Sequence, residues 1–192
     1  MLGIQRRKKS WNLRKMQPTL HSDGCNNSYD ETDAWKIYTA EDFLIKNSMH
    51  ETLVVYPESM DSCGLFESVQ QQYQGTFRFK LHLYQDTNAK EGVPTVFTIQ
   101  KGLKTYLMHC TEDRTLRFEE GSVPRWISGY KSKYIFYKRQ FSEGDAEAFS
   151  FESSILVGYF LASEQEHGCK KLALRSHQHE VNENFRIQLV KV

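Results

Sequence analysis

The sequence predicts an all-β domain over residues 34–192, preceded by a flexible leader over residues 1–33. The first observation is that apolar and polar residues alternate in short segments from Trp35 onward, with many β-branched and aromatic residues, which is typical of strands. The second is that the first 33 residues hold a basic run and a polar run but no periodic apolar pattern. A chain of 192 residues is long enough for one ordinary domain with a tail.

Twelve strands are predicted, and segments rich in turn-forming residues separate them. In chain order the strands are Trp35–Thr39, Asp42–Lys46, Thr52–Tyr56, Phe77–Tyr84, Thr95–Gln100, Tyr106–Cys110, Thr115–Glu119, Tyr134–Gln140, Ala148–Glu152, Tyr159–Ser163, Lys171–Arg175 and Asn184–Val190. No segment after residue 34 carries the long helical apolar period that would predict an α-helix.

The twelve strands divide into three sets of four, and the last strand of each set is the longer, aromatic one. The second strands are identified by Phe43-Leu44-Ile45, Tyr106-Leu107-Met108 and Phe160-Leu161-Ala162. The first set is longer than the others, which we attribute to a polar insertion over Pro57–Gly75. A threefold repeat of four strands indicates a β-trefoil, whose three repeats close one barrel that no single repeat could bury. A β-sandwich with similar strand spacing is the alternative.

Strand alternation also predicts which side chains form the core, because every second residue of a strand faces the same side. The predicted core residues are Phe77, Phe79, Leu81, Leu83, Tyr134, Phe136, Leu161, Phe185, Ile187 and Leu189.

Composition argues against nucleic-acid binding and against membrane insertion. Lys and Arg total 25 while Asp and Glu total 24, so the chain lacks the cationic excess that phosphate binding requires. No run approaches the roughly 20 apolar residues of a membrane span, and no apolar block follows the basic N-terminus as in a signal peptide. The four cysteines (Cys25, Cys63, Cys110 and Cys169) are widely spaced, which favours free thiols and folding in the cytosol.

Candidates for catalysis or metal binding are few, and each has a simpler structural interpretation. His177 and His179 are expected in a solvated loop without further ligands, and Glu164, Glu166 and His167 in a turn. His109 and Cys110 point to opposite faces of a strand, so they are not expected to act as base and nucleophile. The sequence therefore predicts neither an enzyme nor a cofactor.

The leader contains one specific feature, the acidic run from Asp30 to Asp33 followed by the small residue Ala34. A protease that cuts after aspartate needs an accessible segment with a small residue after the bond, and a cut here would release the folded domain intact. An ordinary acidic linker is the alternative. The basic run Arg6 to Lys9 is interpreted as a solvated tail, with a nuclear role left open.

The segment from Phe151 to Ser163, which reads Phe-Glu-Ser-Ser-Ile-Leu-Val-Gly-Tyr-Phe-Leu-Ala-Ser, resembles the signature of interleukin-1 family cytokines. Val157 stands where that family usually has proline, and the Gly-Tyr-Phe-Leu-Ala run looks more like the interleukin-18 branch. The likeness extends over about 35–192 and is strongest after residue 92.

The resemblance implies a β-trefoil, no cofactor, and a monomeric signalling ligand that binds an interleukin-1 receptor family ectodomain and then an accessory receptor. It implies a cytosolic precursor that leaves the cell by an unconventional route, with caspase cleavage between Asp33 and Ala34. By approximate correspondence with the family, the receptor contacts would be Lys131, Lys133, Lys138, Asn184 and Arg186.

Two other functions remain open. A trefoil of another class would bind heparin or another carbohydrate, although the repeated Gln-x-Trp motif of lectin trefoils is missing and the basic cluster Lys131, Lys133 and Lys138 is small. A family member could also block signalling by occupying the receptor without engaging the accessory chain. Asn184 bears on this point, because the corresponding position in the agonist interleukin-1β branch looks acidic.

Overall fold

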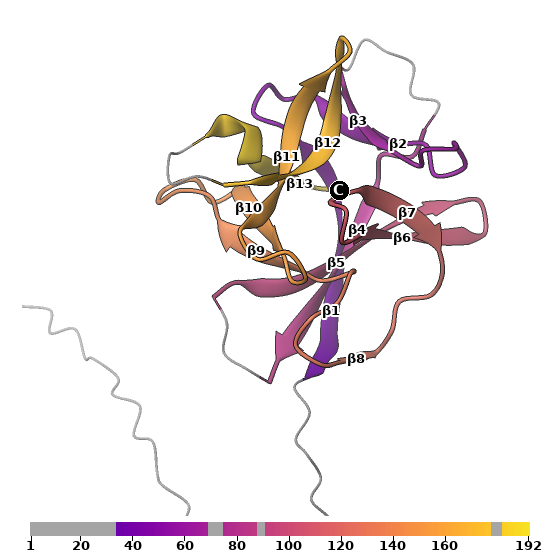
Figure 1. Cartoon of the computed structure of the whole chain (residues 1–192), viewed down its shortest axis with the longest axis vertical. Coiled ribbons are helices and arrows are strands. Elements are labelled where there is room, and N and C mark those ends of the chain that lie inside the picture. Colours follow the sequence, from indigo (N-terminus) through magenta and orange to yellow (C-terminus); the bar gives the residue numbers. More distant parts are fainter. Residues whose placement is uncertain (1–33, 69–74, 88–90, 178–181) are drawn as a thin grey trace, which may run out of the picture. The chain divides into compact units, whose positions relative to one another are not determined.

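The computed structural model describes residues 34–68, 75–87, 91–177 and 182–192 (Figure 1). The expected leader, residues 1–33, lies outside the described residues. The described part holds thirteen strands and one short 3-10 helix, η1. The elements are β1 (Ala34–Lys46), β2 (Thr52–Val55), β3 (Gly64–Glu67), β4 (Phe79–Asp86), β5 (Val93–Lys101), β6 (Lys104–Cys110), β7 (Leu116–Glu120), β8 (Trp126–Ser128), β9 (Phe136–Gln140), β10 (Ala148–Ser153), β11 (Tyr159–Glu166), β12 (Cys169–Ser176), η1 (Glu183–Phe185) and β13 (Ile187–Lys191).

Six of the strands close a barrel. Strand β1 pairs with β4, β4 with β5, β5 with β9, β9 with β10, β10 with β13, and β13 again with β1, all antiparallel. Closure leaves none of the six barrel strands as an open sheet edge, which is the advantage of a barrel over a flat sheet.

Six of the seven remaining strands form three hairpins, β2–β3, β6–β7 and β11–β12, one in each third of the chain. In every third, the first hairpin strand pairs with the barrel strand that precedes it: β2 with β1, β6 with β5, and β11 with β10. Six barrel strands and three hairpins in threefold order define a β-trefoil, so the predicted all-β fold is confirmed and the sandwich is excluded.

The first repeat differs from the prediction in two ways. The two strands predicted before Lys46 are one continuous strand, β1, with a register shift between Ile37 and Thr39 that lets it bend around the barrel. The predicted insertion Pro57–Gly75 contains the missing hairpin strand β3, in which Gly64 and Phe66 are buried. The second strand of the first repeat is therefore β2, and the assignment of Phe43-Leu44-Ile45 to that position was wrong.

Two further differences concern short elements. Strand β8 was not predicted, because it has only three residues and pairs with the distant start of β1. The last strand begins at Ile187 rather than at Asn184, because the Asn182 side chain accepts a hydrogen bond from the Asn184 amide (2.9 Å) and thereby caps η1.

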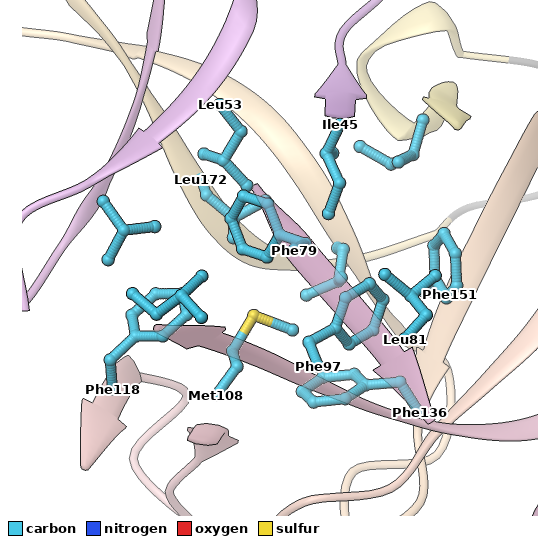
Figure 2. Close-up of a cluster of buried hydrophobic side chains, with 14 of the residues drawn as sticks. Ile45, Leu53, Phe79, Leu81, Phe97, Met108, Phe118, Phe136, Phe151 and Leu172 are labelled. Carbon is cyan, nitrogen blue, oxygen red and sulfur yellow. The ribbon is translucent and has the colours of Figure 1, made fainter. Parts of the chain in front are cut away.

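The core contains side chains from all three repeats, as Figure 2 shows. Phe97 lies edge-on to Phe136 and Phe151, with ring centroids 5.9 and 4.9 Å away, and Phe79 and Leu81 are almost fully buried beside them. Edge-to-face packing is the favoured arrangement of aromatic pairs. Of the predicted core, Phe79, Leu81, Phe136, Leu161, Phe185, Ile187 and Leu189 are buried, whereas Phe77, Leu83 and Tyr134 are half-buried.

Candidate functional site

The segment that resembles the family signature has a structural role in the turn from β10 to β11. Phe151 fills the barrel, and the next residue, Glu152, is buried but forms a 2.5 Å ion pair with Arg139. The second carboxylate oxygen of Glu152 accepts a hydrogen bond from the Gly158 amide at 2.7 Å. Gly158 has a φ of 81°, a conformation that favours glycine. The signature therefore closes this turn.

The same segment fixes the neighbouring loop over residues 129–135. The Ser154 hydroxyl donates to the Ser132 carbonyl at 2.7 Å and accepts from the Ser132 amide at 3.0 Å. The Ser154 amide also donates to the Ile135 carbonyl at 3.0 Å. Two of the predicted receptor residues, Lys131 and Lys133, lie in this loop, so one serine of the signature positions both.

Lys133 belongs to a small polar cluster with β7. Its ammonium lies 2.9 Å from Glu119, which also accepts a short hydrogen bond from the Tyr134 hydroxyl. Burial opposes the shift, but the hydrogen bonds from Tyr134 and then Lys133 lower the pKa of the Glu119 carboxyl. The hydrogen bond with Glu119 raises the pKa of Lys133. His109 lies 3.8 Å from Glu119, and burial lowers the pKa of its imidazole. The ion pair with Glu119 therefore holds the Lys133 side chain against β7.

Lys131 has a different environment. Its side chain is exposed, and its ammonium lies 5.7 Å from the ring centroid of Tyr130, which is itself 61% exposed. A cation above an aromatic ring keeps its charge, so Lys131 can still attract an anion.

Lys138 lies farther along β9, with its ammonium 3.9 Å from the ring centroid of Phe149 on β10. Burial lowers the pKa of this lysine. Lys138 also borders a depression of about 610 Å³, and the aromatic rings of Phe160, His177 and Phe185 meet beside it with centroids 4.8 to 6.2 Å apart.

The last two predicted contacts differ from each other. Arg186 is mostly buried and forms a 2.5 Å ion pair with Asp145, which lowers the pKa of that carboxyl. Asn184 is exposed in η1. The structure thus brings Lys131 and Lys133 together in one loop, whereas Lys138 borders the depression that Phe185 of η1 also lines.

The predicted cleavage site is described on one side only, because Asp33 lies outside the described residues. Ala34 is the first residue of β1, where its amide donates to the Thr87 hydroxyl at 3.0 Å and its carbonyl accepts from the Thr87 amide at 3.3 Å. Ala34 is also the register partner of Ser128 in β8. A protease that binds Ala34 in an extended groove must compete with these contacts.

Two of the catalytic candidates have clear structural partners. Cys110 is buried with its sulfur 3.0 Å from the Ser153 hydroxyl, and Glu164 pairs with Arg175 across the β11–β12 hairpin. His179 lies outside the described residues. In the ranges that the structure describes, no group of His, Cys, Asp or Glu side chains is arranged to hold a metal ion, and no helix is long and apolar enough to cross a membrane.

One group of surface residues was not identified from the sequence. Lys36, Arg125 and Trp126 line a depression of about 370 Å³ where β8 pairs with β1, close to Lys131 along the chain. The pairing of β8 with β1 joins them, and the sequence gives no sign of it. The one available signal was the absence of Asp and Glu from residues 121–142.

Comparison with known proteins agrees with the fold and the signature. The family model described as Interleukin-1 / 18 matches residues 67–187. Interleukin-18 of Gallus gallus is 35% identical over 139 residues, which cover 69% of each chain. Human interleukin-18 is 32% identical over 97 residues, or 50% of this chain and 48% of its own length, so that match spans about half of the relative.

Solved structures show the same fold. The crystal structure of the chicken cytokine interleukin 1 beta superposes with a TM-score of 0.61 at 24% identity, covering 81% of this chain and 99% of the other. The BEL beta-trefoil superposes with a TM-score of 0.51 at 11% identity, covering 79% and 93%. With a family model that covers most of the barrel and a relative this similar over two thirds of both chains, the protein belongs to the interleukin-1 / 18 family of cytokines, a non-enzymatic family.

Proposed function

We propose that this protein is an extracellular ligand that binds the ectodomain of an interleukin-1 receptor family member and then an accessory receptor, after its leader has been removed. Membership of the interleukin-1 / 18 family is the observation that carries the proposal. A lectin-type or growth-factor trefoil of another class is set aside, because the match is to a cytokine family.

The architecture is consistent with a ligand that acts through its surface. The barrel interior is filled by packed side chains, and the polar groups of the signature are satisfied by contacts within the domain. What remains for recognition is the exterior, where loops between strands hold charged and aromatic side chains in fixed positions.

The proposed receptor contacts are Lys131, Lys133, Lys138, Asn184 and Arg186, and their environments predict different contributions. Lys131 is exposed and would act through long-range attraction, so its replacement by glutamate should mainly slow association. Arg186 is paired with Asp145, so its loss would leave that carboxylate without its partner and act mainly through local structure.

The experiment that tests the proposal is a binding screen of the domain from Ala34 to Val192 against interleukin-1 receptor family ectodomains, combined with a reporter of downstream signalling. Binding with signalling identifies an agonist, and binding without signalling identifies an antagonist. Failure to bind any ectodomain of the family would refute the proposal.

We also propose that the full chain is a cytosolic precursor, that a caspase cuts between Asp33 and Ala34, and that the domain leaves the cell by an unconventional route. Two features of the chain support this: the acidic run that ends at Asp33, and the start of β1 at Ala34. A cut at this bond would leave every described strand intact.

A further inference from the structure

The surface around β8 carries an excess of positive charge, which the rest of the domain lacks. Residues 121–142 contain Arg125, Lys131, Lys133, Lys138 and Arg139 but no aspartate or glutamate, although acids and bases are nearly equal in the whole chain. Lys133 and Arg139 are neutralised by Glu119 and Glu152. Arg125 and Lys131 form no ion pair with any residue in the described ranges.

Lys36 adds a further positive charge to this surface. It is the register partner of Trp126 in the β1–β8 pair, and its ammonium lies 5.0 Å from the centre of the indole ring. The Ile37 amide donates to the Arg125 carbonyl at 3.1 Å, which fixes Arg125 against the same strand. We call Lys36, Arg125, Trp126, Tyr130 and Lys131 the β8 patch.

The β8 patch combines cations with exposed aromatic rings. Trp126 is 57% exposed and Tyr130 is 61% exposed, and each ring has a lysine ammonium near it. Because these lysines contact rings rather than carboxylates, their positive charge is not cancelled. The described residues that line the depression of about 370 Å³ are Lys36, Ile37, Arg125 and Trp126, and none of these is acidic.

We propose that the β8 patch binds a sulfated glycosaminoglycan, with one anionic sugar in the depression against Trp126 and the chain continuing toward Tyr130 and Lys131. A sugar ring presents an apolar face to the indole and anionic substituents to Lys36 and Arg125. Trp126 and Lys131 are five residues apart, at most about 18 Å, so one extended polyanion can contact both ends of the patch.

Two other polyanions fit the patch less well. A membrane surface would favour a wider continuous apolar face, whereas the residues between Trp126 and Tyr130 include the exposed Ser128 and the small Gly129. Nucleic acid shares the charge of a sulfated glycan. However, a cytokine of this family acts outside the cell, where sulfated glycans are the abundant polyanions. The choice of a glycan rests on the proposed extracellular location, and Lys131 is shared with the proposed receptor contacts, but the heparin test contains no receptor.

The test measures binding of the full chain to immobilised heparin at several salt concentrations. One variant combines Lys36→Gln, Arg125→Gln and Lys131→Gln, and a matched control combines Lys80→Gln, Lys101→Gln and Lys104→Gln. The control loses the same charge from lysines that already pair with Asp42, Glu58 and Glu120. The four bases of residues 6–9 add the same attraction for heparin in all variants, so the comparison uses only the differences between variants.

We expect the patch variant to bind heparin about tenfold or more weakly near 0.15 M salt and with a shallower salt dependence, because fewer counterions are released. The control should bind like the original chain. Trp126→Ala should weaken binding with the salt dependence unchanged, since it removes a neutral contact. Variants with an altered unfolding midpoint are replaced by single substitutions of the same residues.

Four results would overturn the proposal. The first is equal weakening in patch variant and control, which would mean attraction by net charge alone. The second is undiminished binding of desulfated heparin, and the third is equal competition by single-stranded DNA of the same charge, which would mean a general polyanion site. Absence of heparin binding by the original chain at 0.15 M salt would also refute it.

Discussion

Individual residues of the signature act as a connected unit. Glu152 connects Arg139 to the Gly158 amide, Ser153 contacts Cys110, and Ser154 fixes the loop that carries Lys131. Buried polar groups are costly when unpaired, so these residues depend on one another. The motif was recognised from the sequence, but the contacts that explain it join residues far apart in the chain and could not be read there.

Substitution of Leu161 tests which side chains of the strands face the core. Leu161 is 2% exposed in β11 and lies in the main core cluster, as the alternation predicts. Leu161→Ala should lower the free energy of unfolding by about 2–5 kcal/mol, because a cavity remains where the side chain was. Urea denaturation measures this loss, and a change below about 0.5 kcal/mol would place Leu161 outside the core.

His82 makes stability depend on pH. Its Nε2 lies 2.9 Å from the Thr98 hydroxyl in a buried site, and burial, followed by the charge of Lys80, lowers its pKa from 6.5 to about 4, while Asp42 opposes the shift. The unfolded chain therefore binds the proton more readily than the folded one. Stability from this residue is fully present above pH 6.5 and is lost as the pH falls toward 4.

The loss assigned to His82 is about 3 kcal/mol over that range. His82→Gln should flatten the decline between pH 6.5 and pH 4 relative to the original chain. Urea denaturation of both proteins at pH 7.5, 6, 5 and 4 gives the comparison, and parallel curves would show that another group causes the decline.

Among the elements, sequence reasoning identified the strands with clear alternation or a dense apolar run, such as β2. It missed β3, β8 and the continuity of β1. Strand β4 was predicted to within a few residues, because its buried Phe79, Leu81 and Tyr84 recur along an aromatic segment. Strands β3 and β8 have four and three residues, too few for a period, and exist because a partner strand is already in place. The tertiary context, rather than local preference, decides such strands.

The start of β1 leads to a prediction about cleavage. Because the Ala34 amide donates to the Thr87 hydroxyl, we expect a protease to reach the bond after Asp33 more easily when this end of the strand opens. Thr87→Val keeps the shape of the side chain and removes the acceptor, which should raise the cleavage rate about two- to fivefold.

Cleavage of the Thr87→Val variant is followed with a caspase that cuts after aspartate. Thr39→Val on the same strand serves as the control, since it makes a similar change away from the cut. An equal rate in the variant and the original chain would mean that fraying of β1 does not limit cleavage.

At the scale of the whole molecule, the barrel could be predicted from the sequence, because its three repeats bury one common core. The positions of the charged groups did not follow, because they depend on loops held by distant residues, as Arg186 is held by Asp145 and Lys133 by Glu119. The five proposed receptor residues therefore differ in exposure and pairing, although they looked equivalent in the sequence.

The leader should inhibit receptor binding, and its removal should relieve this inhibition. Ala34 is fixed beside Thr87 and Ser128, so an uncut chain continues from this point with 33 additional residues, including six bases and four acids. The prediction is that a segment of this length, attached at Ala34, obstructs the approach of a receptor. Cleavage after Asp33 replaces it with a single charged amine at Ala34.

Two measurements check this expectation. Sequencing the new N-terminus after caspase treatment should give a chain that begins at Ala34, and an intact chain or another start would refute the assigned cut. Receptor binding of the intact and cut proteins should then differ mainly in association rate, because the leader obstructs approach rather than the final contacts. Equal affinities and equal rates would mean that the leader is removed without having inhibited the ligand.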